Sequence, residues 1–290
     1  MSASFGGEVA VYYKKIFDNH RRPNGPWKKM VDIVREYVKQ LPEAAPPKIL
    51  DLASGPGEPA ASLAKMLKAT GREDAVVYST DVASDMVDKA KDLAEKEEVA
   101  EKVKCLVVDA QDIEGCAELK DEKFDVITIC YGYMFCPELE KAVEQTYKAL
   151  KPGGLLVSTH WVKMPYMMLC KAVMTAVMTA KGLEPPTAPP SINPMSLSQG
   201  QLMPMLEKQG FVDLQVEENE YSFTLGQDRE EQYGMATIPI RDKVEKLEAH
   251  DLAKEKFPEC AEQFTTTDES GDMIMGGMVY ALVTCKKAAT

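Results

Sequence analysis

The sequence predicts an α/β protein whose main domain is a doubly wound, largely parallel sheet. From residue 48 onward, short and nearly continuous apolar runs alternate with segments of helical periodicity. That alternation is typical of parallel strands covered by helices on both faces. The first apolar run leads into a glycine-containing turn, KILDLASGPGEPA (Lys48–Ala60), which is a common way to open a ligand site in such a sheet.

Five strands and three helices follow one another in the first half of this pattern. The strands are expected at Lys48–Ala53, Ala75–Asp81, Val103–Ala110, Phe124–Gly132 and Leu155–Trp161. The helices are expected at Pro59–Ala69, Ser84–Glu95 and Pro137–Leu150. The segment KPGG (Lys151–Gly154) ends the third helix, because proline and two glycines cannot continue it.

The pattern changes after Trp161. A helix with a methionine stripe is expected at Pro165–Lys181, and a second helix at Ser198–Gln209. Two segments, Phe211–Thr224 and Met278–Lys286, alternate like strands. We predict a helical lid or extension at residues 1–47 and one main domain at residues 48–290. The main domain carries two insertions on the substrate side, at about 162–208 and about 228–266.

Composition narrows the function classes. With 34 Lys and Arg against 46 Asp and Glu, the net charge is −12, so no basic footprint for nucleic acid is visible. The seven cysteines are scattered without a C-x-x-C pair, which gives no support to a metal site and favours a reducing compartment. No apolar stretch is long enough to insert into a membrane. We expect a cytoplasmic protein, monomeric or homodimeric.

Acidic residues end three consecutive predicted strands, and they bear on the kind of ligand. Asp51, Asp81 and Asp109 close the first, second and third strands, and Glu58 stands in the first turn of the following helix. A pyrophosphate at that helix end would be repelled by Glu58. A cationic ligand such as S-adenosylmethionine, which carries an ammonium and a sulfonium but no phosphate, would be attracted.

The ordered motifs resemble those of class I S-adenosylmethionine-dependent methyltransferases, nearest to the small-molecule group that contains the ubiquinone/menaquinone C-methyltransferases. LDLASGPG resembles the first motif, with Ala53 in place of its first glycine, and YSTDVASDMVDKAK, VVDAQDI, FDVITICYGYMF and ALKPGGLLVSTHW resemble the next four. The resemblance covers Lys48–Trp161. It implies a seven-stranded Rossmann-like sheet with an antiparallel terminal hairpin, a helical N-terminal lid and an insertion after strand five.

The resemblance also implies the cofactor, S-adenosylmethionine, with S-adenosylhomocysteine as product, and the positions that bind it. Asp81 takes the ribose hydroxyls and Asp109 lies in the adenine motif. The expected cofactor-binding residues are Tyr12, Tyr13, Asp51, Ala53, Ser54, Gly55, Gly57, Asp81, Val82, Met86, Asp109, Ala110, Gln111, Cys130 and Tyr131. Tyr12 or Tyr13, in the lid, would lie near the sulfonium, where a tyrosine face is attractive.

Candidate catalytic residues are His160, Tyr131 and Tyr133. His160 follows strand five near the expected acceptor, and an imidazole is a suitable general base, although the pattern slightly favours a satisfied, partly buried histidine. A carbon or oxygen acceptor needs such a base, or a network at Tyr131 and Tyr133. A sulfur or tertiary-amine acceptor needs none, because it carries a free lone pair.

We therefore predict an enzyme that transfers a methyl group from S-adenosylmethionine to a small-molecule acceptor. The YGYMF segment (Tyr131–Phe135) resembles enzymes that S-methylate a thioether acid in dimethylsulfoniopropionate synthesis, and O, N and C acceptors stay open. One alternative is an NAD(P)- or FAD-binding oxidoreductase, through G-x-G-x-x-A at Gly55–Ala60. Another is a non-catalytic protein that binds S-adenosylmethionine.

Overall fold

The structure, a computed structural model, describes residues 16–43, 45–72, 74–185 and 197–289 of the chain. The chain divides into two compact units. The larger unit comprises Pro23–Trp161, Pro194–Asn219 and Tyr280–Thr290. The smaller unit comprises Met1–Arg22, Val162–Asn193 and Glu220–Val279.

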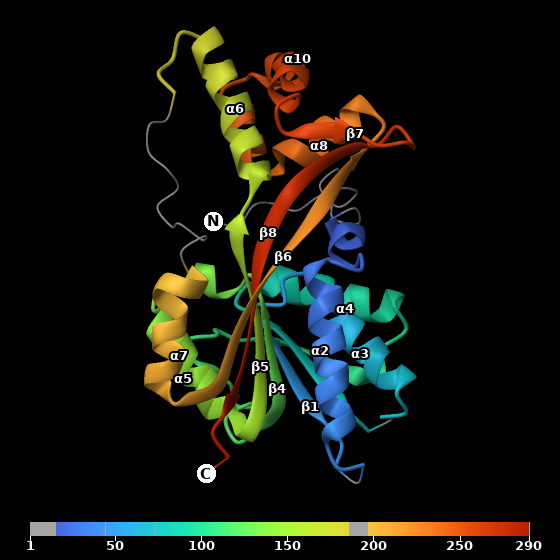
Figure 1. Ribbon diagram of the computed structural model, residues 1–290, viewed down its shortest axis with the longest axis vertical. Helices are drawn as coiled ribbons and strands as arrows, with labels where there is room; N and C mark the ends of the chain where they lie inside the picture. The colour runs from blue at the N-terminus through green and yellow to red at the C-terminus, as the bar shows by residue number, and fades with distance from the viewer. Residues whose placement is uncertain (1–15, 44, 73, 186–196, 290) are drawn as a thin grey trace. The chain divides into compact units, whose positions relative to one another are not determined.

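An eight-stranded sheet forms the frame, with the strand order β3-β2-β1-β4-β5-β8-β6 and a short β7 paired with β8 (Figure 1). Its strands are β1 (Lys48–Leu52), β2 (Val76–Asp81), β3 (Val103–Val107), β4 (Phe124–Cys130), β5 (Leu150–Lys163), β6 (Phe211–Gly226), β7 (Thr265–Thr267) and β8 (Met273–Lys287). Strands β1 to β5 pair in parallel, and β8 runs antiparallel to β5 and β6. The order reverses between β1 and β4, and ligands bind at the carboxyl edge of such a switch point.

Helices cover both faces of the sheet in the larger unit. They are α2 (Pro26–Gln40), α3 (Ala60–Ala69), α4 (Ser84–Lys96), α5 (Leu139–Ala149) and α7 (Met203–Gln209), with short helical turns at Ala100–Lys102, Ile113–Gly115, Tyr133–Phe135 and Leu197–Leu202. Helices α2, α3 and α4 lie on one side, and α5 and α7 on the other (Figure 1). Helix α2 begins with Pro26, which suits the first turn, and buries Met30, Val34 and Val38 at helical spacing.

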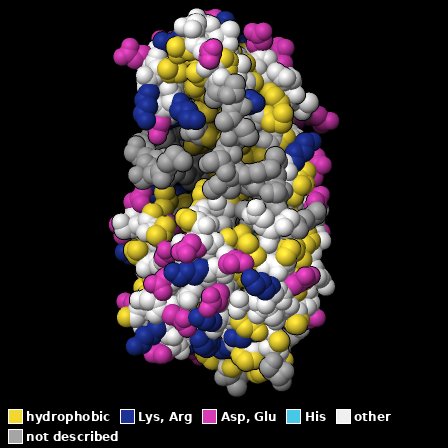
Figure 2. Space-filling model, turned by 90° about the vertical axis from the view of Figure 1, so that its left-hand side faces the viewer, with side chains coloured by type: hydrophobic (Ala, Val, Ile, Leu, Met, Phe, Trp, Pro, Cys, Tyr) yellow, Lys and Arg dark blue, Asp and Glu magenta, His cyan; other side chains and the backbone are white. Residues whose placement is uncertain are grey.

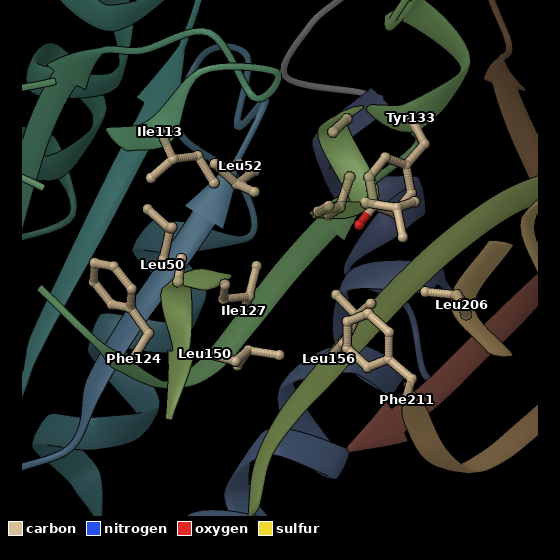
Figure 3. Close-up of a cluster of buried hydrophobic side chains, with 14 of the residues drawn as sticks. Leu50, Leu52, Ile113, Phe124, Ile127, Tyr133, Leu150, Leu156, Leu206 and Phe211 are labelled. Carbon is tan, nitrogen blue, oxygen red and sulfur yellow. The ribbon is translucent and has the colours of Figure 1, made fainter. Parts of the chain in front are cut away.

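The core of the larger unit fills the space between the sheet and the α5–α7 side. Ile127 of β4 and Leu156 of β5 are completely buried there, together with Leu206 of α7 (Figure 3). Each such side chain contributes about 1.5–3 kcal/mol by leaving water. This core holds the carboxyl ends of the central strands in fixed positions.

The smaller unit is mainly helical. It contains α6 (Pro165–Ala180), α8 (Arg229–Thr237), a turn at Ile238–Ile240, α9 (Arg241–Lys246) and α10 (His250–Ala261). Helix α6 packs against α8 and α10, and the Tyr166 hydroxyl donates to the Met235 carbonyl at 2.6 Å. The Asn19 side chain exchanges two hydrogen bonds with the backbone of Thr224, at 3.1 and 2.8 Å, which ties the segment before α2 to β6.

The predicted fold class is confirmed, and the bounds of several elements differ from those expected. Strand β3 ends at Val107, before Asp109, and β8 begins at Met273 rather than Met278. The short β7 adds a strand to the seven expected. Strand β5 begins at Leu150 rather than Leu155, because Leu150 pairs with Phe124 and a register shift follows that pair. Among the residues described, none of the helices has the length and apolar character needed to cross a membrane.

Candidate active site

Asp51 forms the base of the glycine turn, where β1 ends, and it is completely buried. Its carboxylate accepts hydrogen bonds from the Ala60 N–H (3.1 Å), the Thr128 hydroxyl of β4 (2.6 Å) and the Ser54 hydroxyl. Burial raises the pKa of Asp51 to about 7, despite these donors. Asp51 thus joins β1, β4 and α3, and its charge changes near neutral pH.

The N-terminus of α3 is occupied by oxygen atoms of the chain itself. The Ala60 N–H donates to Asp51, the Ala61 N–H to the Gly57 carbonyl (3.0 Å) and the Ser62 N–H to the Glu58 carboxylate (3.2 Å). Glu58 is only 3% exposed. A phosphate at this helix end would therefore meet buried carboxyl groups in place of free donors.

Asp81 holds the other side of the turn. One of its carboxylate oxygens accepts the Gly55 N–H (2.9 Å) and the other accepts the Ala83 N–H (3.0 Å). The Ser54 N–H also donates to the Thr80 carbonyl at 2.8 Å, so the turn is fixed to the end of β2. Because each carboxylate oxygen has a second lone pair, Asp81 retains the capacity to accept two hydroxyl groups of a ribose.

The turn itself depends on glycine at one close contact. Gly57 has φ of +104°, and a Cβ there would lie 2.9 Å from the Ala90 Cα in α4. Ala53, where the resemblance expects glycine, has φ of +53°. Its Cβ would lie 2.7 Å from a Cβ built on Gly132 at the end of β4, so Ala53 is accommodated by a glycine on the neighbouring strand.

Polar groups follow β3, and an exposed apolar side chain follows the neighbouring strand β2. Exposed Asp109 accepts the Gln111 N–H at 2.8 Å, and the Gln111 side chain accepts the Glu138 N–H at 2.7 Å. Val82, directly after Asp81, is 67% exposed. An exposed valine beside a ribose acceptor is a suitable surface for a flat purine ring.

Aromatic side chains line the ends of β4 and β5. The Tyr131 ring stacks on Trp161, with centroids 4.1 Å apart and planes 2° from parallel. Tyr131 has φ of +57°, an uncommon conformation for a bulky residue. The Cys130 thiol accepts the Thr159 hydroxyl at 3.3 Å, and burial raises its pKa to about 12, so it is uncharged at neutral pH.

His160 and Tyr133 lie on the opposite face of the sheet, toward α5. The Tyr133 hydroxyl donates to Thr146 of α5 at 3.0 Å, and Tyr133 belongs to the core (Figure 3). The His160 ring lies parallel to that of Tyr133, and its Nε2 is 2.9 Å from the Ser158 hydroxyl. Burial lowers the pKa of His160 to about 3. These surroundings suit a structural histidine better than a general base.

The sequence-predicted residues thus fall into three groups. The first group, around the turn and the adjoining strand ends, contains Asp51, Ala53, Ser54, Gly55, Gly57, Asp81, Val82, Asp109, Ala110 and Gln111. Met86 lies close by in the chain, in the first turn of α4. Cys130 and Tyr131 end β4, whereas Tyr133 and His160 point into the core. Tyr12 and Tyr13 lie outside the described residues, and the binding roles of all these residues stay predictions.

Two residues of the site were not singled out from the sequence. Thr128 binds Asp51 from β4, and Trp161 stacks on Tyr131. The alternation of side chains along a strand could have indicated the face on which each residue lies. Thr128 is on the same face as Cys130, and Trp161 is on the face opposite to that of His160. Which residue each of them contacts on the neighbouring strand depends on the strand register, which the structure gives.

Solved structures share the fold. YcgJ from Bacillus subtilis is 16% identical with a TM-score of 0.51, covering 89% of this chain and 97% of that one. Phosphoethanolamine N-methyltransferase 2 from Haemonchus contortus, solved with S-adenosylhomocysteine, is 17% identical with a TM-score of 0.52, covering 97% and 57%. The [4+2]-cyclase SpnF is 18% identical with a TM-score of 0.51, covering 90% and 82%. Likeness at these identities shows the fold and leaves the reaction open.

Curated relatives and a family profile are more specific. The ubiquinone/menaquinone biosynthesis C-methyltransferase UbiE of Rickettsia typhi is 31% identical over 44% of this chain and 49% of its own length. The UbiE of Hydrogenovibrio crunogenus is 32% identical over 43% and 46%. The chain spans about half the length of the curated relatives it matches. The profile of the ubiE/COQ5 methyltransferase family matches residues 17–183, more than half of the 290 residues. The chain therefore belongs to the ubiE/COQ5 methyltransferase family.

Proposed function

We propose that this protein is an enzyme that transfers a methyl group from S-adenosylmethionine to a small-molecule acceptor and releases S-adenosylhomocysteine. The observation that carries the proposal is the N-terminus of α3, where Asp51 and Glu58 take the backbone donors. A dinucleotide pyrophosphate needs those donors free. A ligand with a positive amino group and no phosphate suits two buried carboxyl groups instead.

The residues present fit this cofactor along its length. The Asp81 carboxylate suits the ribose diol, and Asp109 with Gln111 suits the polar edge of adenine. Exposed Val82 suits the face of the purine. When bound, S-adenosylmethionine supplies a methyl group on a positively charged sulfur. The contribution of the chain is then to orient the two reactants in line and to exclude water.

The acceptor we propose carries its own lone pair, as the sulfur of a thioether acid or a tertiary amine does. His160 is neutral at physiological pH, is buried, and stacks on Tyr133, whose hydroxyl is bound to Thr146. The Cys130 thiol is also held neutral. None of these three groups is suited to remove a proton from an acceptor near pH 7.

A second candidate acceptor is a ring carbon of a quinol. It is favoured by the relatives named as ubiquinone/menaquinone C-methyltransferases. Such a reaction releases a proton and therefore needs a base. We expect the base, if this acceptor is used, to come from a residue other than His160 and Tyr133.

Calorimetric titration tests the cofactor directly. We expect S-adenosylmethionine and S-adenosylhomocysteine to bind, and NADH and NADPH to give no heat of binding. Binding of NADH without S-adenosylhomocysteine would overturn the proposal in favour of an oxidoreductase.

The acceptor is found by screening thioether acids, tertiary amines, phenols and quinols for release of S-adenosylhomocysteine. Release with a thioether at a rate independent of pH between 6 and 8, measured at saturating S-adenosylmethionine, supports the lone-pair acceptor. An amine supports it if its rate follows only the deprotonation of the amine itself. Release with the quinols alone supports carbon methylation. Binding of the cofactor with no turnover of any class would indicate a non-catalytic binding protein.

A further inference from the structure

The stacked rings of Tyr131 and Trp161 stand beside the glycine turn. Gly132 follows Tyr131 directly, and a Cβ built on it would lie 2.7 Å from the Ala53 Cβ and 3.6 Å from the Leu52 carbonyl oxygen. The Tyr131 N–H donates to the Thr159 carbonyl of β5 at 3.1 Å. The pair is thus fixed to the edge of the sheet where β1, β4 and β5 end.

The order of the strands places this pair next to the reacting end of the proposed cofactor. Asp109 follows β3 and Asp81 ends β2, so adenine and ribose follow the sheet from β3 to β2. The next strands in the sheet are β1 and then β4. The sulfur, which is joined to the ribose by a single carbon, therefore comes between the turn after β1 and the end of β4, where Tyr131 stands.

The surrounding structure holds the Tyr131–Trp161 stack in place despite an unfavourable backbone conformation at Tyr131. Tyr131 is held at φ of +57°, which L side chains other than asparagine and aspartate rarely adopt. Its ring is nevertheless parallel to Trp161 within 2°. Strained backbone that the surrounding structure holds in place is a recurrent feature of ligand sites.

Asp51 and Glu58 attract the amino group that S-adenosylmethionine and S-adenosylhomocysteine share, so they do not separate the two ligands. Trp161 is 8% exposed, so Tyr131 is the ring of the pair that a cationic sulfur can meet at this strand end. The Cys130 thiol is uncharged, because burial raises its pKa to about 12. The Asp51 carboxylate is completely buried and accepts hydrogen bonds from three donors. The face of an aromatic ring carries partial negative charge and attracts a cation within about 6 Å.

We infer that the Tyr131–Trp161 pair is a binding surface for positively charged sulfur, which makes the enzyme hold S-adenosylmethionine more tightly than S-adenosylhomocysteine. This inference rests on the proposed function. In the reaction, the acceptor lone pair forms a bond to the methyl carbon while the carbon–sulfur bond breaks and its electron pair stays on sulfur. The donor sulfur becomes a neutral thioether, so its attraction to the rings ends and product release is favoured.

The test is the ratio of two dissociation constants, S-adenosylhomocysteine over S-adenosylmethionine, measured by calorimetry without any acceptor. Tyr131→Leu removes the ring, and Tyr131→Gly removes the ring and also relieves the positive φ, so it protects the test against misfolding. Tyr131→Phe keeps the ring. We expect the leucine and glycine variants to lower the ratio by about 3- to 30-fold through weaker binding of S-adenosylmethionine, and the phenylalanine variant to retain it.

Tyr147→Leu is the matched control, since Tyr147 packs edge-on against Phe211 and is partly buried against the core beside α7. It should leave the ratio unchanged. An unchanged ratio in folded Tyr131→Leu and Tyr131→Gly, with S-adenosylhomocysteine still bound, overturns this inference alone. Equal weakening of both ligands also overturns it, because the pair would then act by shape. Failure of the unmodified protein to bind either ligand overturns the proposed function, and this inference with it.

Discussion

Replacing Gly132 with alanine tests how closely the end of β4 packs against the glycine turn. Gly132 has φ of −80° and ψ of −41°, which alanine adopts without strain. The perturbation is therefore steric alone. An ideal Cβ at this position would lie 2.7 Å from the Ala53 Cβ and 2.8 Å from the Ile129 Cγ2, both well inside van der Waals contact.

The size of the effect follows from these two contacts. Overpacking of a rigid core costs about 1–3 kcal/mol, and alanine recovers about 0.4–1 kcal/mol by restricting the unfolded chain. We expect Gly132→Ala to lower the free energy of unfolding by about 1–2 kcal/mol. Ala53→Gly alone should change it by less than about 1 kcal/mol, since relief of the positive φ is offset by the greater freedom of glycine when unfolded.

Urea unfolding followed by tryptophan fluorescence is the assay, because both tryptophans, Trp27 and Trp161, belong to the larger unit. In the double variant Ala53→Gly/Gly132→Ala one of the two close contacts is gone. We expect a coupling free energy of at least about 0.5 kcal/mol between the two positions, as is found for residues in contact. Additive single effects, or a Gly132→Ala variant as stable as the unmodified protein, would refute the packing argument.

Three further predictions concern the site. Asp81→Ala should weaken binding of S-adenosylhomocysteine by about 1.5–3 kcal/mol, the value of hydrogen bonds to a charged group, and unchanged affinity in calorimetry would make Asp81 only a structural cap. Burial raises the pKa of Asp51 to about 7, and a cationic ligand prefers the ionised form of this carboxyl. Affinity for S-adenosylmethionine should therefore rise as the pH increases through 7, and binding should release protons. Asp51→Asn should abolish that pH dependence in calorimetric titrations at several pH values. His160→Ala should lower turnover per folded molecule by less than about tenfold, whereas loss of a general base costs about 10²–10⁴-fold; a larger fall, with a lost pH dependence near neutrality, would restore His160 as the base.

The order of strands and helices was predictable from sequence because it depends on local patterns. The central strands β1, β2 and β4 are buried on both faces, so each reads as an apolar run, and Gly55 and Gly57 mark the turn after the first of them. The boundaries were less certain at Leu150, where proline and two glycines suggest a turn. There the pairing of Leu150 with Phe124, far apart in sequence, decides that the strand begins early.

The roles of side chains at the site were likewise predictable where they depend on residue type, and not where they depend on tertiary packing. Charge is carried by residue type, so the argument that Glu58 opposes a phosphate needs only the sequence, and the hydrogen bond from the Ser62 N–H strengthens it. The environment of His160 depends on which face of β5 packs against α5, and no local pattern reveals that. Because neighbouring residues of a strand point to opposite faces, the same assignment that buries His160 against Tyr133 turns Trp161 toward Tyr131. The chemistry at this strand end is therefore aromatic rather than acid–base, which is why a lone-pair acceptor is the better first choice.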